Sequence, residues 1–233
     1  MSAYLQIRDL CVTLKGGTPI LRRVSLDVAA GQVHGLVGES GAGKSMIGKA
    51  VLGTLPRALQ VTRGEIWLDG VDLMRLRPAE RRRRIGASAA LIPQDPLTAL
   101  NPVQTIGRQV AETIRVHDPS VSRAEAEARA AETLARVGLP QERFPLSRYP
   151  HELSGGQRQR VVIAIAIALR PRLLIADEPT TALDVTTQAQ ILELLTRLAR
   201  EDGMGLLMIT HDLAVVADMA DRIVVMRKGK IVE

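Results

Sequence analysis

The chain has 233 residues, a net charge of +6, 46% apolar residues and 24% charged residues. This length is enough for one large domain with a buried core, and the composition excludes wholesale disorder. Aromatic residues make up only 2% of the chain, which argues against a surface that stacks on nucleic-acid bases. The single cysteine, Cys11, excludes a disulfide within the chain and a thiolate metal cluster, and it suits a reducing cytoplasm.

The first seventy residues predict a small antiparallel sheet beside a strand–loop–helix unit. Alternating apolar residues predict two strands joined by a turn at residues 15–17. An apolar strand at residues 33–37 leads into a glycine-rich loop and a helix. Another strand is expected at residues 64–70, with Gly64 and Gly70 as its boundaries.

The middle of the chain predicts helices. Pro78 opens a short helix that carries four arginines at 81–84, a run typical of a solvated helix face, with a specific anion site as the less common alternative. Ser122 and Glu125 have the spacing of a capping box, and Gly138 follows the end of that helix. The longest apolar run, residues 161–169, is too short for a membrane span of roughly 20 residues and predicts a buried helix. The N-terminus lacks the pattern of a secretory signal.

The last third alternates between strands and helices. Strands are predicted at 173–176 and 205–210, an amphipathic helix at 187–200, and a hairpin at 223–232 with its turn at Lys228 and Gly229. This alternation predicts an α/β fold with a parallel sheet covered on both faces.

One loop carries a complete phosphate-binding motif. The pattern G-x-x-x-x-G-K-[ST] is matched by Gly38, Glu39, Ser40, Gly41, Ala42, Gly43, Lys44 and Ser45. Glycines let the backbone curl so that its N–H groups point at phosphate oxygens, and the following helix adds its positive end. Lys44 would reach the β- and γ-phosphates, and the Ser45 hydroxyl would bind Mg²⁺. A chance match in a flexible loop is the alternative, which the flanking strand and helix disfavour.

A second motif supplies carboxylates. The apolar strand at 173–176 ends in Asp177 and Glu178. Asp177 can hold the magnesium, and Glu178 can polarise a water for in-line attack on the γ-phosphate. Without the phosphate loop, two solvated acids at a strand end would be the preferred interpretation.

The pentapeptide at 153–157, LSGGQ, stands between these motifs and resembles the signature of ATP-binding cassette (ABC) ATPases. Ser154 can cap the next helix with Gln157, while Gly155 and Gly156 leave N–H groups bare at its positive end. A simple capped helix is the alternative. The resemblance implies one ABC cassette over residues 1–233: a RecA-like P-loop NTPase core, a small antiparallel β subdomain, and a helical subdomain inserted at about 97–160.

The resemblance also implies individual roles. Gln94 resembles the glutamine that senses magnesium and the attacking water in the family. His211 resembles the histidine that contacts the γ-phosphate. Residues 182–184, including Asp184, resemble the loop that touches an opposite cassette. In the family two cassettes pair head to tail, and the signature of each closes on the ATP of the other. The implied catalytic residues are therefore Glu178, His211 and Gln94, and the implied metal-binding residues are Ser45, Gln94 and Asp177. Leu14 departs from the family, which usually places an adenine-stacking aromatic residue there.

Residues 95–102, 149–160 and 176–185 are similar to the dipeptide, oligopeptide and nickel importer branch. This similarity implies an ATP- and Mg²⁺-dependent subunit, peripheral on the cytoplasmic face of the inner membrane. The implied partners are an identical or different second cassette, integral membrane permease subunits and, indirectly, a periplasmic substrate-binding protein. Members usually continue past the position of residue 233, so the sequence is truncated, is half of a tandem chain, or lacks the extension.

Two rival functions fit parts of the sequence. An ABC ATPase that acts on nucleic acid or the ribosome would suit the positive charge. However, no long coiled-coil insertion lies between Gln94 and Leu153, and nucleic acid is not expected as a partner. A small-molecule kinase would need an acceptor pocket and a lid, and it leaves residues 153–157 unexplained.

Overall fold

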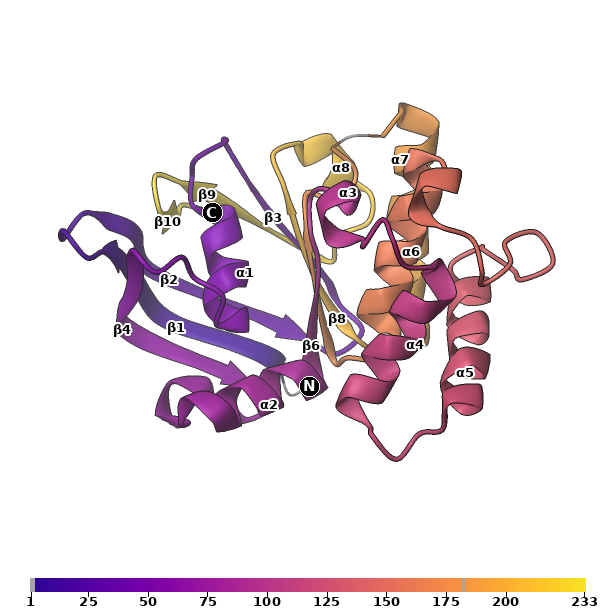
Figure 1. Cartoon of the computed structure of the whole chain (residues 1–233). Coiled ribbons are helices and arrows are strands. Elements are labelled where there is room, and N and C mark those ends of the chain that lie inside the picture. The colour runs from indigo at the N-terminus through magenta and orange to yellow at the C-terminus, as the bar shows by residue number, and fades with distance from the viewer. Residues whose placement is uncertain (1–2, 182) are drawn as a thin grey trace. The chain divides into compact units, whose positions relative to one another are not determined.

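The computed structural model describes residues 3–181 and 183–233, which fall into two compact units (Figure 1). The sheet unit contains the described residues up to 91 together with 172–178 and 196–233. The helical unit contains residues 92–171 and the described part of 179–195. Each unit is presented by itself below.

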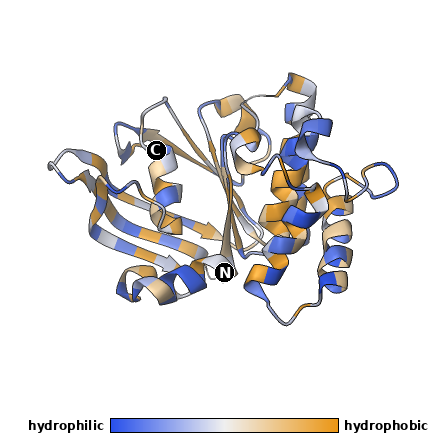
Figure 2. Ribbon diagram, viewed as in Figure 1, coloured by the Kyte–Doolittle hydropathy of each residue, from blue (hydrophilic) through white to orange (hydrophobic). Residues whose placement is uncertain are grey.

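The antiparallel sheet of the sheet unit has the strand order β2-β1-β4-β5. Its strands are β1 (Ala3–Leu14), β2 (Pro19–Ala29), β4 (Leu59–Leu68) and β5 (Val71–Asp72). Apolar and polar residues alternate along β1 and β2, as the two-colour banding of their ribbons in Figure 2 shows. This alternation gives each strand one buried face, as the sequence predicts.

The second sheet has the order β10-β9-β3-β8-β7-β6 and is mainly parallel. Its strands are β3 (Val33–Gly38), β6 (Ala89–Ile92), β7 (Leu173–Asp177), β8 (Gly205–Thr210), β9 (Arg222–Arg227) and β10 (Lys230–Ile231). Strand β3 is parallel to β8 and β9, β7 is parallel to β8, and β9 and β10 form the expected antiparallel hairpin. Every residue of β8 is buried, which is usual for a central parallel strand.

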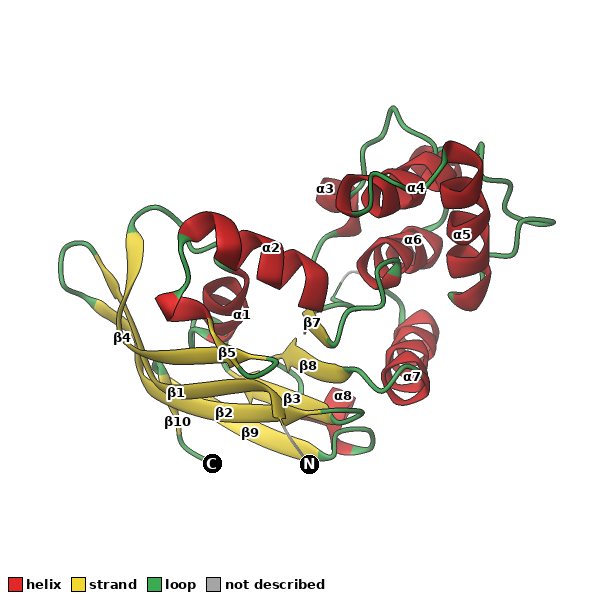
Figure 3. Cartoon of the chain, turned by 90° about the horizontal axis from the view of Figure 1, so that it is seen from below, coloured by secondary structure: helices red, strands yellow, loops and turns green. Residues whose placement is uncertain are grey.

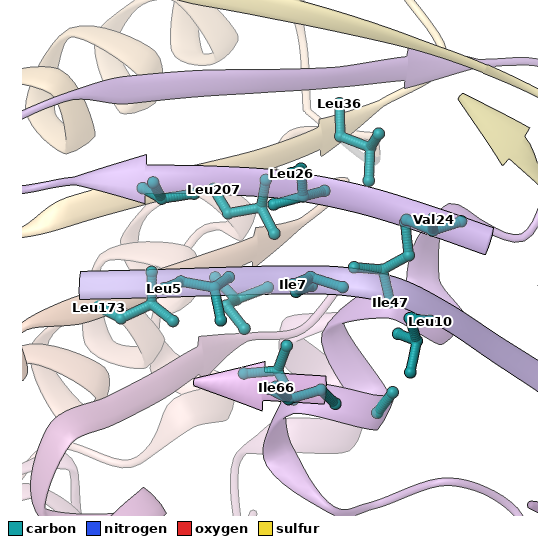
Figure 4. Close-up of a cluster of buried hydrophobic side chains, with 14 of the residues drawn as sticks. Leu5, Ile7, Leu10, Val24, Leu26, Leu36, Ile47, Ile66, Leu173 and Leu207 are labelled. Carbon is teal, nitrogen blue, oxygen red and sulfur yellow. The ribbon is translucent and has the colours of Figure 1, made fainter. Parts of the chain in front are cut away.

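The core of the sheet unit joins both sheets to α1 (Lys44–Leu52). Figure 4 shows side chains from β1, β2, β3, β4, β7, β8 and α1 in one cluster, including Ile7, Leu36, Ile47 and Leu207. Each fully buried aliphatic side chain of this kind contributes about 1.5–3 kcal/mol to stability. The shared core holds α1, and therefore the loop before it, against the parallel strands. The sheet unit also contains η1 (Leu73–Arg75), α2 (Pro78–Ser88) and α8 (Leu213–Ala217).

The helical unit is a bundle around α6 (Gly155–Ile167) (Figure 3). Its other elements are α3 (Pro96–Ala99), α4 (Ile106–His117), α5 (Arg123–Arg136), η2 (Pro150–Glu152) and the first part of α7 (Val185–Glu201). Val161 and Ile163 of α6 are fully buried, so the long apolar run is a core helix, as expected. No helix in the described part of the chain is long and apolar enough to cross a membrane.

Two local predictions are wrong. Gly64 does not begin a strand: β4 starts at Leu59, and Gly64 lies within it with φ +101°. A β-carbon there would lie 2.6 Å from the Leu10 Cα, where the pairing with β1 shifts register. The capping box at α5 is only half formed, because Ser122 accepts from the Glu125 N–H while the Glu125 carboxylate binds Arg129.

The arginine run on α2 is not uniformly solvated. Arg82 and Arg83 are exposed, as expected. Arg84 is half-buried and donates to the carbonyl and carboxylate oxygens of Asp69 at 3.0 and 2.8 Å. Arg172 binds the other carboxylate oxygen of Asp69. The last arginine of the run therefore holds α2 to the turn between β4 and β5.

We predict that Gly64→Ala destabilises the protein by about 3 kcal/mol or more, because it combines a left-handed backbone with a steric clash. Gly31→Ala is the matched control, since Gly31 has φ +65° and a β-carbon added there would meet nothing within 4 Å. The control should lose only about 1 kcal/mol. Urea denaturation measures both values, and equal losses would contradict the assignment of Gly64 to a crowded bulge.

Candidate nucleotide-binding site

The phosphate loop connects β3 to α1 and has the backbone that its glycines allow. Gly41 and Gly43 have φ values of +79° and +101°, which place both in the left-handed region. The helix begins at Lys44 directly after Gly43. A β-carbon on Gly41 would meet nothing within 4 Å, so the curl of the loop rather than crowding requires glycine there. The loop therefore presents backbone N–H groups beside a helix N-terminus, a combination that binds phosphate.

Lys44 folds back over the loop. The residue is 5% exposed, and Nζ donates to the carbonyl oxygens of Gly38 at 2.7 Å and Glu39 at 3.0 Å. These two bonds keep the ammonium group at the loop instead of in bulk solvent. The positive charge is thus already placed where phosphate oxygens would be bound.

Ser45 and Asp177 meet although 132 residues separate them in the chain. The Ser45 hydroxyl donates to Asp177 Oδ1 at 2.8 Å. Burial raises the pKa of the Asp177 carboxyl above its ordinary value, an effect that the hydrogen bond from Ser45 opposes. A half-buried carboxylate beside a hydroxyl is an oxygen pair suited to a hard divalent cation, which would also relieve the desolvation of the charge.

Glu178 and His211 form a second pair at the same edge of the sheet. Glu178 Oε1 lies 3.3 Å from His211 Nδ1, and the Glu178 side chain is 17% exposed. Glu178 has φ +48°, which is unusual for a residue with a side chain, and its N–H donates to Ile209 O at 2.9 Å. Strained backbone that is held by a tertiary hydrogen bond is common at functional sites. His211 lies between β8 and α8, whose N-terminus Asp212 caps.

The helical unit contains the signature segment, and its capping box is confirmed. Ser154 Oγ accepts from the Gln157 N–H at 3.3 Å, and Gln157 Oε1 accepts from the Ser154 N–H at 2.9 Å. Ser154 and Gly155 are exposed at the start of α6. A β-carbon on Gly156 would lie 2.4 Å from Thr187 Cγ2, so this glycine also permits close packing against α7. The sequence did not predict that packing role.

The loop before α7 is partly described. Asp184 is exposed, and its Oδ1 accepts from the Thr187 N–H at 3.0 Å. That backbone hydrogen bond lowers the pKa of Asp184 below its ordinary value. Asp184 therefore caps α7, a local role that is compatible with contact to a partner. Ala182, which belongs to the same predicted contact loop, lies outside the described residues.

The predicted site residues are thus divided between the units. The sheet unit brings together the phosphate loop 38–45, Asp177, Glu178 and His211. The helical unit holds Gln94, the signature 154–157 and Asp184. Gln94 is exposed in the segment between β6 and α3. Within the described residues, no group of three or more His, Cys, Asp or Glu side chains forms a metal site.

Sequence reasoning missed three features around the phosphate loop. It did not predict the strained backbone of Glu178, the contact of Met226 with both ends of the loop, or the bond between Gly229 and Ala42. The sequence did mark Lys228 and Gly229 as a turn. Nothing in the local pattern indicates that this turn reaches the phosphate loop, which lies far earlier in the chain.

The loop, its lysine and the carboxylates define a P-loop nucleotide-binding protein. The family model described as "ABC transporter" matches residues 21–181. The chain is 47% identical over 234 residues to the dipeptide transport ATP-binding protein DppD of Haemophilus influenzae, in a match that covers 99% of this chain and 71% of that protein. The chain belongs to the ABC transporter family.

Other relatives and solved structures agree with this assignment. The oligopeptide transport ATP-binding protein OppD of Mycobacterium tuberculosis is 50% identical over the whole chain, which spans 38% of that protein's length. A dimeric post-hydrolysis structure of the ATP-binding cassette MJ0796 bound to ADP and Pi superposes with a TM-score of 0.85 and 29% identity, covering 98% of this chain and 97% of that one. CbiO1 from Clostridium perfringens gives a TM-score of 0.87 at 26% identity, covering 100% and 88%. The fold is therefore the ABC cassette, and the α/β prediction is confirmed.

We predict that Lys44→Ala weakens ATP binding at least tenfold, because it removes a charge that is held over the phosphate loop. His211→Ala should change ATP binding less than threefold and reduce hydrolysis, since His211 lies against the Glu178 carboxylate. Calorimetric titration and a phosphate-release assay measure the two effects. If both variants lost ATP binding equally, the assignment of His211 to the hydrolytic step would be wrong.

Proposed function

We propose that the chain is the ATP-hydrolysing subunit of an ABC importer for peptides or a related small solute such as nickel. The juxtaposition of Ser45 with Asp177, beside the pair Glu178 and His211, supports the hydrolytic part of this proposal. The similarity to proteins named for dipeptide and oligopeptide transport supports the importer part. The proposed cassette occupies residues 1–233, with a helical subdomain at about 97–160.

The residues of the sheet unit have distinct proposed roles. The loop 38–45 binds the phosphates through its N–H groups, and Lys44 supplies a positive charge. Glu178 acts as the general base that takes a proton from the attacking water. Its carboxylate is mostly shielded from solvent but still partly exposed at the end of β7, where a water could reach it. His211 orients that carboxylate and contacts the γ-phosphate. Gln94 contributes from the helical unit to sensing the metal and the water.

Magnesium fits the donors that are present. Ser45 and Asp177 offer a hydroxyl and a carboxylate oxygen at the phosphate loop, and Mg²⁺ usually takes one or two such protein ligands while phosphates and water complete its shell. When bound, the ion would neutralise charge on the β- and γ-phosphates.

A second cassette is the first proposed partner. Exposed Ser154 and Gly155 at the start of α6 form a positive helix end that is separate from the phosphate loop's own helix. We propose that this end, residues 154–157, closes on ATP held by an identical or different second cassette. Asp184, exposed in the same unit, contacts that partner.

The remaining partners follow from the importer assignment. They are integral membrane permease subunits and, indirectly, a periplasmic substrate-binding protein, so the proposed location is the cytoplasmic face of the inner membrane. Leu14 ends β1 and is half-buried. We propose that it covers adenine by apolar contact in place of the family's usual aromatic residue.

We predict that Glu178→Gln keeps ATP binding within about threefold of the wild type and lowers hydrolysis by at least a hundredfold. The amide preserves the shape of the side chain but cannot accept the proton. Calorimetry with MgATP and single-turnover phosphate release test the two parts. Asp212→Asn, a nearby cap variant outside the proposed site, is the control and should hydrolyse ATP at nearly the normal rate. Near-normal turnover in Glu178→Gln would exclude Glu178 as the base.

The importer and nucleic-acid alternatives differ in what the ATP-locked protein captures. We expect tagged Glu178→Gln, purified with MgATP from its native cells, to recover a second cassette and integral membrane subunits. Lys44→Ala, which should not lock, is the control preparation. Mass spectrometry identifies the captured protein subunits, and nuclease-sensitive staining detects captured RNA or DNA. Enrichment of RNA or DNA without membrane subunits would replace the importer assignment with the nucleic-acid alternative.

A further inference from the structure

The hairpin of β9 and β10 packs against the phosphate loop, although the two segments are far apart in the sequence. Strand β9 pairs with β3 up to the start of the loop, where Gly38 lies opposite Met226. A β-carbon on Gly38 would lie 2.2 Å from the Met226 carbonyl oxygen. The Met226 side chain reaches the other end of the loop, where its Cε lies 3.2 Å from the position that a β-carbon on Gly43 would take. Met226, which is 1% exposed, therefore contacts both ends of the loop.

The turn of this hairpin holds the centre of the loop. The Gly229 N–H donates to the Ala42 carbonyl oxygen at 2.9 Å. The Gly229 carbonyl oxygen accepts from the Arg22 N–H of β2 at 2.7 Å. The turn is thus bonded to the phosphate loop on one side and to β2 on the other, so its position is set by the antiparallel sheet as well as by β9. Strand β10 lies beside β2 in Figure 1.

The bond to Ala42 controls the direction of an N–H group. The Ala42 carbonyl and the Gly43 N–H belong to one planar trans peptide group and point in opposite directions. Because Gly229 binds that carbonyl, the Gly43 N–H points away from the hairpin. Gly43 has φ +101°, a conformation in which glycine also allows the reversed peptide orientation at little cost. The reversed orientation would direct a carbonyl oxygen, instead of an N–H, at an anionic ligand.

Gly229 is required at this place for a steric reason. It has φ +78°, and a β-carbon there would lie 2.2 Å from the Ile20 carbonyl oxygen and 3.6 Å from the Leu21 Cα. The obstacle is backbone of β2, which cannot move aside as a flexible side chain could. Any side chain at residue 229 must therefore displace the turn from its place beside β2, and this displacement disturbs the geometry of the hydrogen bond to Ala42.

We infer that the hairpin of β9 and β10 is a positioning element for nucleotide binding, in which the Gly229 N–H fixes the orientation of the Ala42–Gly43 peptide and Met226 supports both ends of the phosphate loop. This inference rests on the proposed ATP binding by residues 38–45. Gly229 and Met226 are positioning residues, because they act through the loop and make no proposed contact with the nucleotide.

The chain contains a close match for a control. The turn between β4 and β5 has Asp69 at φ +51° and Gly70 at φ +74°, and the turn between β9 and β10 has Lys228 at φ +47° and Gly229 at φ +78°. A β-carbon on Gly70 meets nothing within 4 Å. Gly70→Ala therefore introduces the same backbone strain as Gly229→Ala without displacing a neighbour or touching the phosphate loop.

The experiment compares MgATP affinity, measured by calorimetry on the full chain well below the unfolding temperature, for wild type, Gly229→Ala and Gly70→Ala. We expect Gly229→Ala to bind at least tenfold more weakly and Gly70→Ala to stay within twofold of wild type. Unfolding temperatures of both variants show how much each loses from strain alone. Equal affinities in the two variants would overturn the inference, whereas a wild-type chain that does not bind MgATP would overturn the proposed function and the inference with it.

A second pair of variants decides the matter if Gly229→Ala does not fold. Met226→Ala removes the contact with Gly43 and leaves the residues of the turn unchanged. Met208→Ala is the control, because it removes the same side-chain atoms from a buried position in β8, where Met208 pairs with Gly35 and Ala176. We expect Met226→Ala to weaken MgATP binding at least fivefold and Met208→Ala to change it less than twofold. Equal changes in the two methionine variants would overturn the inference.

Discussion

The parallel register of β3, β7 and β8 is the constraint on which the site depends. Val37 lies opposite Thr210, and Asp177 lies opposite Ile209, so all three strands end at one edge of the sheet. The segments after these strands are therefore brought to the same place: the phosphate loop, the two carboxylates and His211. Parallel α/β sheets bind ligands at this edge for the same reason. A shift of register in one strand would separate Ser45 from Asp177.

The apolar core makes this arrangement precise enough for chemistry. Leu36, Ile175, Leu207 and Ile209 are fully or almost fully buried in the strands that carry the site. Their packing removes water from beneath the carboxylates, and burial raises the pKa of Asp177. The same packing holds Glu178 in a left-handed conformation that its own residue type disfavours. Stability of the core and geometry of the site therefore have one physical origin.

The phosphate loop shows how a flexible sequence becomes an ordered binding surface. Its glycines permit the curl but also permit other conformations, so the loop needs bonds from outside itself. Lys44 supplies bonds from the following helix, and the hairpin of β9 and β10 supplies a bond from the far end of the chain. The signature segment uses a different solution, because the capping box of Ser154 and Gln157 is formed entirely within one turn of helix.

The features that the sequence determined by itself are local. The motif at 38–45, the carboxylates after 173–176, the capping box at 154–157 and the periodicity of α7 each depend on residues a few positions apart, so they could be predicted and lie in the expected elements. Tertiary structure decided the rest. Glu178 meets His211, Gly229 meets Ala42, and Gly64 proves to be a crowded bulge within β4, because sheet register brings distant backbone together. Register depends on the summed packing of whole strands, and no short segment of the chain encodes it.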